Sequence, residues 1–262
     1  MKGVEDAGGC PDCKAGEHVG LLVSFMTRTE FASWVKRRLT PGQYFGLQLT
    51  LGATLFTIAA WIFGGIAEEV ARGEPVTTVD DEIARWFRAH EIARVTRAMS
   101  LVSTFHTWPI SMLASAFLAY LLARRRWIWA LFGSCAVAGG IALNTVLKIA
   151  FHRERPTLSG LASALYTYSF PSGHTLAATL VYGVLAAYAV RHTSTRAARV
   201  AIVAGAISAV SLVAFSRLYL GVHYLTDVLA AVAEGVAWLA LCYTAAQTFV
   251  GHRARIASRA AR

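Results

Sequence analysis

Six long apolar runs limit what this chain can fold into. They cover about residues 44–66, 100–123, 127–150, 173–190, 200–220 and 225–248 of the 262. Each run reaches the roughly 20 residues that an α-helix needs to cross the hydrocarbon core of a bilayer. None alternates like a strand of a membrane β-barrel, and backbone groups in lipid must be satisfied internally. The runs therefore predict an all-α bundle of six transmembrane helices.

The composition agrees with a membrane protein. The chain is 56% hydrophobic and only 15% charged, with a mean hydropathy of +0.49, which is unlike a soluble domain of this length. Its net charge of +10 comes with no basic soluble surface, so we expect no nucleic-acid partner. The expected partners are the bilayer and a lipid substrate, and the oligomeric state is left open.

The distribution of Lys and Arg predicts the orientation. Most of the 25 basic residues lie in four segments that the six spans would place on one side of the membrane. These are the N-terminal segment, the turn at residues 124–126, the turn at residues 191–199 and the C-terminal tail. Because basic loops stay in the cytoplasm, both termini should be cytoplasmic. The resulting domains are a cytoplasmic tail over 1–43, a six-helix membrane domain over 44–248 and a basic cytoplasmic tail over 249–262.

Two further helices are expected outside the spans. In the N-terminal tail, Phe31, Trp34 and Leu39 share one helical face, which fits either a short interfacial helix or an extension of the first span. In the long outer loop over 68–97, Thr78 and Asp81 form a capping-box pattern that predicts a helix along the outer surface. That helix could gate lipid entry or only pack on the bundle.

Three short clusters beside the apolar runs carry the chemistry. They read K-x6-R-P from Lys148, P-S-G-H from residue 171, and S-R-x5-H-x3-D from residue 216. Together they supply three cations, two histidines, a carboxylate and a Ser-Gly pair that opens a helix. That set suits binding a phosphate and moving it onto a histidine.

In the first cluster, Lys148 and Arg155 are seven residues apart. Two turns of helix would return them to one face, about 10 Å apart along the axis. A lysine near the membrane interior is costly and indicates function, and arginine donates two hydrogen bonds to phosphate oxygens. Pro156 should end the helix, and Arg153 with Glu154 is expected to form a solvated pair.

In the second cluster, Ser172 is a natural N-cap, and the backbone N–H groups after it can face an anion. Gly173 lets a phosphate approach the backbone closely. His174, on the first turn, would then lie beside the phosphate. We expect it to act as the general acid that protonates the departing oxygen.

In the third cluster, Arg217 adds a phosphate ligand and Gly221 allows the chain to turn. His223 and Asp227 are four residues apart and would lie on one face of a helix, within hydrogen-bonding reach. A carboxylate that holds one imidazole nitrogen frees the other to attack. This predicts His223 as the nucleophile and Asp227 as the group that orients it.

All three clusters match the motifs of the type 2 phosphatidic acid phosphatases, or lipid phosphate phosphatases, which this chain resembles from residue 148 to 227. The resemblance implies a phosphohistidine on His223, orientation by Asp227 and leaving-group protonation by His174. It also implies the phosphate ligands Lys148, Arg155, Ser172, Gly173 and Arg217. No metal or other cofactor is expected, since the fixed cations supply the positive charge that magnesium gives other phosphoryl-transfer enzymes.

The predicted function is therefore a metal-independent lipid phosphatase with its site at the outer, periplasmic face. Arginine far outnumbers lysine in an alanine-rich chain, which hints at a GC-rich bacterium, and we expect the protein in the bacterial cytoplasmic (inner) membrane. Undecaprenyl diphosphate, phosphatidylglycerol phosphate, phosphatidic acid and lipid A are candidate substrates in phospholipid and envelope metabolism. By analogy we favour undecaprenyl diphosphate, which is recycled at that face.

Three alternatives stay open. A lipid phosphotransferase would use the same phosphohistidine but pass the phosphate to an alcohol. Vanadium-dependent haloperoxidases share the motif set, although six spans argue against that class. The third is a catalytically silent lipid-binding protein, against which the intact set of motif residues argues.

A few polar residues fall outside the three motifs. Glu234 lies seven residues after Asp227, where it could pair with a buried partner or take part in proton movement or lipid selection. Cys10, Cys13 and His18 provide only three of the four ligands of a zinc site, so a flexible tail is favoured over metal binding, and an overlong start is a further alternative.

Overall fold

The computed structural model describes residues 44–73, 76–156 and 167–260. The chain divides after Tyr44, and the description below concerns Phe45–Arg262. The expected N-terminal tail over 1–43, with its interfacial helix and its Cys10, Cys13 and His18, lies outside the described residues.

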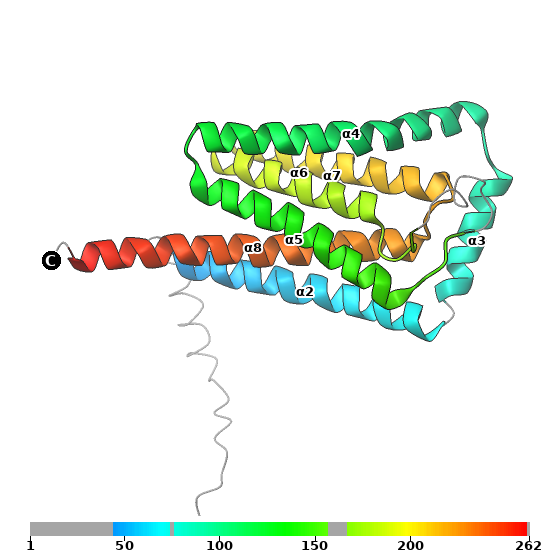
Figure 1. Ribbon diagram of the computed structural model, residues 1–262, viewed down its shortest axis with the longest axis horizontal. Coiled ribbons are helices and arrows are strands. Elements are labelled where there is room, and N and C mark those ends of the chain that lie inside the picture. Colours follow the sequence, from blue (N-terminus) through cyan, green and yellow to red (C-terminus); the bar gives the residue numbers. More distant parts are fainter. Residues whose placement is uncertain (1–43, 74–75, 157–166, 261–262) are drawn as a thin grey trace, which may run out of the picture. The chain divides into compact units, whose positions relative to one another are not determined.

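Seven helices make up the described chain, and they confirm the all-α class (Figure 1). In order they are α2 (Tyr44–Arg72), α3 (Val76–Ala89), α4 (Ala93–Ala123), α5 (Trp127–Phe151), α6 (Gly173–Arg191), α7 (Arg196–Tyr219) and α8 (Leu225–Ala260). All of them except α3 are long and apolar enough to cross a membrane, which gives six candidate spans. The six predicted spans are confirmed.

Large apolar side chains on the outside of the bundle fit a lipid environment. On α2, Leu51 is 60% exposed and Trp61 is 78% exposed. On α4, Phe105 and Trp108 are similarly open. A soluble monomer rarely exposes so much contiguous apolar surface. This surface and the six candidate spans identify the chain as an integral membrane protein.

Helix α6 packs against α5, α7 and α8, and small residues let it approach α8 closely. A Cβ atom built on Gly235 of α8 would lie 2.7 Å from Thr179 Cγ2 and 3.3 Å from Leu176 Cδ1, both on α6. The absence of a side chain at Gly235 is therefore a packing requirement. The close α6–α8 contact aligns the start of α6 with the start of α8.

Helix α3 lies crosswise over one end of the bundle (Figure 1). It contacts α7 and α8, and Phe87 packs edge-to-face on Phe215 and Tyr219 of α7. The helix expected within residues 68–97 is thus confirmed. Its start differs, because Thr78 lies inside α3, which already includes Val76, so the capping-box prediction was wrong.

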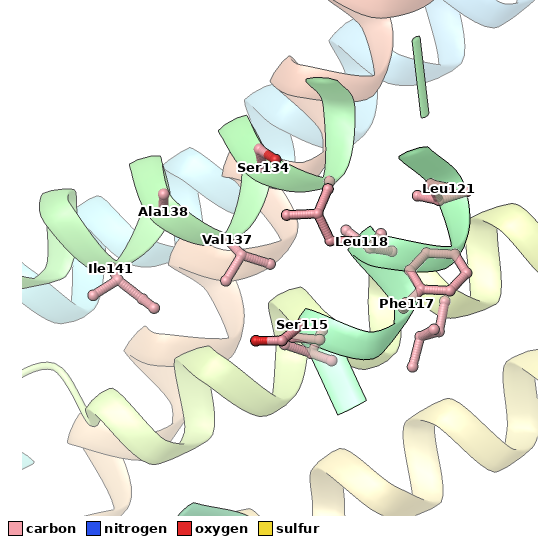
Figure 2. A pocket seen from close by; sticks show the side chains of 13 residues that line it. Ser115, Phe117, Leu118, Leu121, Ser134, Val137, Ala138 and Ile141 are labelled. Atoms are coloured by element: carbon pink, nitrogen blue, oxygen red, sulfur yellow. The ribbon is translucent and has the colours of Figure 1, made fainter. Parts of the chain in front are cut away.

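An apolar groove lies between α4, α5 and α6, with a volume of about 300 Å³. Phe117, Leu118 and Leu121 line it from α4, and Val137 and Ile141 line it from α5 (Figure 2). The lining is almost entirely hydrocarbon. The groove lies within three candidate spans and is therefore at membrane depth.

Candidate active site

The three motifs meet at the end of the bundle that α3 crosses (Figure 1). Lys148 is in the last turn of α5, and Arg217 is in the last turn of α7. Ser172 directly precedes α6, and Asp227 is in the first turn of α8. Two helix C-terminal ends and two N-terminal ends thus supply the side chains.

His223 and Asp227 form the predicted pair. Nδ1 of His223 lies 3.3 Å from Oδ2 of Asp227, and both side chains are almost fully buried. The pairing is confirmed, but the expected helix geometry is wrong, because α8 begins only at Leu225. His223 lies instead on the turn that follows Gly221, whose φ of +60° is the left-handed conformation that glycine adopts freely.

The carboxylate of Asp227 is held from several sides. Its Oδ2 also accepts hydrogen bonds from the backbone N–H of Tyr224 at 2.9 Å and from the hydroxyl of Ser169. Its Oδ1 accepts from Nη1 of Arg153 at 2.7 Å. A buried carboxylate needs such donors. These three, together with Nδ1 of His223, fix the orientation of the Asp227 carboxylate.

The other ring nitrogen of His223 faces Arg155. Nη1 of Arg155 lies 3.2 Å from Nε2 of His223. Guanidinium groups only donate, so Nε2 accepts this bond and Nδ1 carries the proton that points at Asp227. Burial lowers the pKa of His223 to about 4, although the carboxylate of Asp227 raises it. The ring is therefore neutral near pH 7, with its lone pair on Nε2.

Arg155 reaches the site from a loop. Nη1 donates to the carbonyl of Val222 at 2.8 Å, and Nε donates to the carbonyl of Thr167 at 2.8 Å. The expected continuous helix from Lys148 to Arg155 is wrong. His152 adopts a left-handed φ of +48°, which ends α5 at Phe151, before Pro156 can act.

Lys148 lies beside the start of α6. Its ammonium donates to the carbonyl of Tyr168 at 2.7 Å and to that of Ser169 at 3.4 Å. A Cβ atom built on Gly173 would lie 3.8 Å from Lys148 Cε. Lys148 and Gly173, 25 positions apart in the sequence, are therefore neighbours in space, as the phosphate-site prediction requires.

Ser172 occupies the N-cap position of α6, as expected, with an extended backbone. Among the described residues its hydroxyl makes no capping bond to a backbone N–H and instead accepts a hydrogen bond from Thr175 Oγ1 at 3.1 Å. Its own N–H donates to the carbonyl of Asp227 at 3.0 Å. This bond joins the second motif to the third. The first N–H groups of α6 have no intrahelical acceptors and can face an anion.

Arg217 and His174 complete the constellation. Arg217 is 5% exposed, its Nη1 donates to the hydroxyl of Ser103, and its Nε has no partner among the described residues. His106 of α4 lies against His174, with Nε2 of His106 3.1 Å from the carbonyl of His174. Sequence analysis assigned no role to His106. Its position, three residues after Ser103 on α4, shows that α4 forms one wall of the site.

Arg153 is the main residue that sequence reasoning misjudged. Its side chain is only 11% exposed, and it bridges Asp227 to Asp80 of α3, with Nη2 2.8 Å from Asp80 Oδ2. Burial lowers the pKa of its guanidinium, but the two carboxylates outweigh burial and raise it. The expected solvated pair with Glu154 is therefore wrong. The available signal was the position of Arg153, two residues before the expected phosphate ligand Arg155.

Glu234 has a partner within the bundle. Its Oε2 accepts a hydrogen bond from Nδ2 of Asn144 on α5 at 3.0 Å. Its Oε1 has no partner among the described residues. The partner is thus an amide, four residues before Lys148, and the pair lies directly beneath Lys148 and Gly173.

Comparison with known proteins agrees with this arrangement. Residues 127–250 match the model of the PAP2 superfamily. Phosphatidylglycerophosphatase B of Bacillus subtilis (strain 168) is 43% identical over 97 residues, which are 36% of this chain and 46% of the relative. The match therefore spans less than half of the length of that relative.

Two crystal structures share the fold. The transmembrane PAP2-type phosphatidylglycerolphosphate phosphatase from Bacillus subtilis superimposes with a TM-score of 0.61 and 25% identity, covering 73% of this chain and 94% of that chain. Aquifex aeolicus LpxE gives a TM-score of 0.50 and 20% identity over 63% of this chain and 94% of that chain, a likeness of fold alone.

The bundle and the matched motifs define an integral membrane protein with a PAP2-type fold. Residues 127–250, which contain all three motifs, match the PAP2 superfamily. The resemblance inferred from the three motifs is thereby confirmed.

Proposed function

We propose that this protein is a metal-independent lipid phosphatase that works through a phosphohistidine on His223. The observation that carries the proposal is the arrangement of the His223 ring. Asp227 holds Nδ1, while Nε2 faces the guanidinium of Arg155. A neutral imidazole with a fixed tautomer, beside a phosphate-binding cation, is suited to attack phosphorus.

The proposed reaction has two steps. Nε2 of His223 forms a bond to phosphorus while the bond from phosphorus to the lipid oxygen breaks, and His174 gives its proton to that oxygen. Water then attacks the phosphohistidine as His174 takes a proton from the water, and phosphate leaves with His223 neutral again. Lys148, Arg155 and Arg217 stabilise the charge on the phosphoryl oxygens throughout.

A lipid substrate is supported by the apolar groove of Figure 2. Ile141 lines the groove and precedes Lys148 by seven residues, which is about 10 Å of helix. Val181, on its α6 side, follows His174 by the same number of residues. A phosphate held at the bundle end and a hydrocarbon chain in this groove would fit one lipid molecule.

Among lipid substrates we now favour phosphatidylglycerol phosphate. Two of the similar proteins carry that activity in their names, and one of them is 43% identical over the matched region. This similarity outweighs the analogy that favoured undecaprenyl diphosphate. We further propose the bacterial inner membrane, with cytoplasmic termini and the motif end of the bundle at the periplasmic face.

The deciding experiment measures phosphate release by the purified protein in detergent with EDTA. Phosphatidylglycerol phosphate, undecaprenyl diphosphate and phosphatidic acid are compared as substrates. The wild type should release phosphate from at least one lipid, and His223→Ala should not. The matched control is His252→Ala, because His252 is an exposed histidine at the far end of α8.

Two results would sink the proposal. One is release by His223→Ala at the wild-type rate, and the other is a wild type that works only after Mg²⁺ is added. Transfer of the phosphate to an added alcohol in preference to water would instead identify the phosphotransferase alternative.

A further inference from the structure

Asp80 of α3 is a buried carboxylate outside the three motifs. It is 1% exposed although it belongs to the helix that crosses the bundle end. Its Oδ1 accepts the backbone N–H of Thr226 at 3.1 Å. Its Oδ2 accepts the hydroxyl of Thr226 and Nη2 of Arg153 at 2.8 Å. Both oxygens are therefore in use.

The contacts of Asp80 converge on the first turn of α8. A helix leaves its first N–H groups without intrahelical acceptors, and a carboxylate there stabilises the helix. Here the carboxylate comes from another helix, so α3 caps α8 from outside. The residue after Thr226 is Asp227, which orients His223. Asp80 thus fixes the turn that carries Asp227.

Arg153 is the second link between Asp80 and Asp227. Its two terminal nitrogens are divided between two carboxylates, with Nη1 on Asp227 and Nη2 on Asp80. The guanidinium also stacks over the ring of Tyr224, 4.3 Å from its centre. The orientation of the guanidinium plane is therefore fixed, and only Nη1 reaches Asp227.

This division protects the bond to His223. An arginine with both arms available prefers a bidentate pair with one carboxylate. If Nη2 were released from Asp80, Arg153 could engage both oxygens of Asp227, including the Oδ2 that faces His223. Asp80 occupies Nη2 and leaves Oδ2 to the histidine.

We propose that Asp80 is a positioning residue for phosphate transfer, which acts through Arg153 to keep the Asp227 carboxylate on His223. The role rests on the proposed phosphatase function. It makes α3 a part of the reaction machinery and more than a cover over the bundle end.

The test compares Asp80→Asn with the matched control Glu82→Gln, an exposed carboxylate two residues further along α3. Thr226 N–H and Nη2 of Arg153 use different oxygens of Asp80, and an amide replaces one of these oxygens by an NH₂ group, so one of the two donors loses its acceptor. We expect kcat of Asp80→Asn to fall about tenfold or more with KM within about twofold, because binding groups are untouched. Glu82→Gln should match the wild type.

A double-mutant cycle with Arg153→Lys separates positioning from general damage. Lysine lacks the fork, so Asp80 loses its link to Asp227 through Arg153 and keeps only its contacts with Thr226. The loss in the double variant should therefore be smaller than the product of the two single losses, whereas independent roles would multiply. If Asp80→Asn does not fold, Asp80→Glu keeps the charge one methylene further out, and it should show a reduced kcat with unchanged KM.

A spectroscopic readout tests the geometry without turnover. NMR of histidine-labelled protein should show the Nδ1 proton of His223 far downfield, assigned by its loss in His223→Ala. Asp80→Asn should lose or shift this signal, and Glu82→Gln should keep it.

The outcomes are distinct. A wild type that releases no phosphate overturns the proposed function, and the NMR signal then still decides whether Asp80 positions Asp227. An active wild type with Asp80→Asn equal to Glu82→Gln in both kcat and signal overturns the inference about Asp80 and leaves the proposed function standing.

Discussion

Nη1 of Arg155 lies 3.2 Å from Nε2 of His223, so the proposed phosphate ligand and the proposed nucleophile face the same space. A phosphoryl group that enters would exchange the bond between them for its own contacts with both. Arg155 is anchored independently by the carbonyls of Val222 and Thr167. The guanidinium can therefore stay in place as the ring nitrogen changes its partner.

The protonation of His223 gives the first prediction. Burial lowers its pKa to about 4, against about 6.5 for a free histidine. The ring should stay neutral, and able to attack, down to about pH 4, as measured by NMR titration of labelled histidine. Titration of His223 near pH 6.5 would contradict the described burial.

The same shift has a consequence for stability. Between about pH 6.5 and pH 4 the unfolded chain binds a proton at this position and the folded chain does not. Stability from the neutral buried ring is therefore complete above pH 6.5 and is lost as the pH falls toward 4. Melting temperatures of the wild type should fall through this window more steeply than those of His223→Gln, which has no titrating ring.

Replacing Asp227 by Asn tests its role in orienting the ring. The amide can present its NH₂ group to His223 and favour the wrong tautomer, while Arg153 loses a buried carboxylate. By comparison with other carboxylate–histidine pairs, kcat should fall by about two to four orders of magnitude. Phosphate-release kinetics measure the loss, and a change of less than about tenfold would show that Asp227 does not set the tautomer.

Gly173 gives a prediction about substrate access. A Cβ atom there would contact Asn144 Oδ1 at 3.5 Å and Lys148 Cε at 3.8 Å, which are ordinary distances. Gly173→Ala should therefore fold normally, but its methyl group narrows the approach of phosphate to the backbone. We expect KM to rise by about tenfold or more with the melting temperature unchanged.

The matched control for this change is Gly205→Ala on α7, where a new methyl group would meet nothing within 4 Å. Its KM and melting temperature should both equal those of the wild type. An equal KM in Gly173→Ala and Gly205→Ala would place the phosphate away from the start of α6.

Two variants of Glu234, the partner of Asn144, can separate a structural role of this residue from a chemical one. Glu234→Gln keeps an oxygen for the Asn144 donor, so folding and rate should both be close to wild type. Glu234→Leu leaves the amide unpaired and should lower stability by about 1–3 kcal/mol. The melting temperature and kcat of each variant check this. A large loss of kcat in Glu234→Gln with normal stability would instead indicate a role in proton movement.

The membrane fold was accessible from sequence because span length is a simple physical requirement. The boundaries of the helices were harder to predict from sequence. α4 begins at Ala93, seven residues before the predicted span. Hydropathy missed this start because the first turns of α4 contain Arg94 and Arg97. It also missed the end of α8 at Ala260, which lies in a basic segment.

The motif residues were predicted because each motif is short and chemically distinctive. The residues that hold the motif side chains in place were not predicted. Asp80 and Arg153 are 73 residues apart, and nothing local marks either as buried. Arg153 stands next to Glu154, so a solvated pair was the simpler interpretation. Only the folded chain shows that its partners come from α3 and α8.

The hydrogen bond from Ser172 N–H to the carbonyl of Asp227 has a consequence for biogenesis. α8 is the last of the described helices to emerge during synthesis, and it brings the acceptor, the orienting carboxylate and the counter-ion of Arg153 together. A chain that has inserted only its earlier spans holds the cations without the group that organises them. The proposed lipid phosphatase activity should therefore arise in one step, when α8 enters the membrane, so that unfinished molecules leave the surrounding lipids intact.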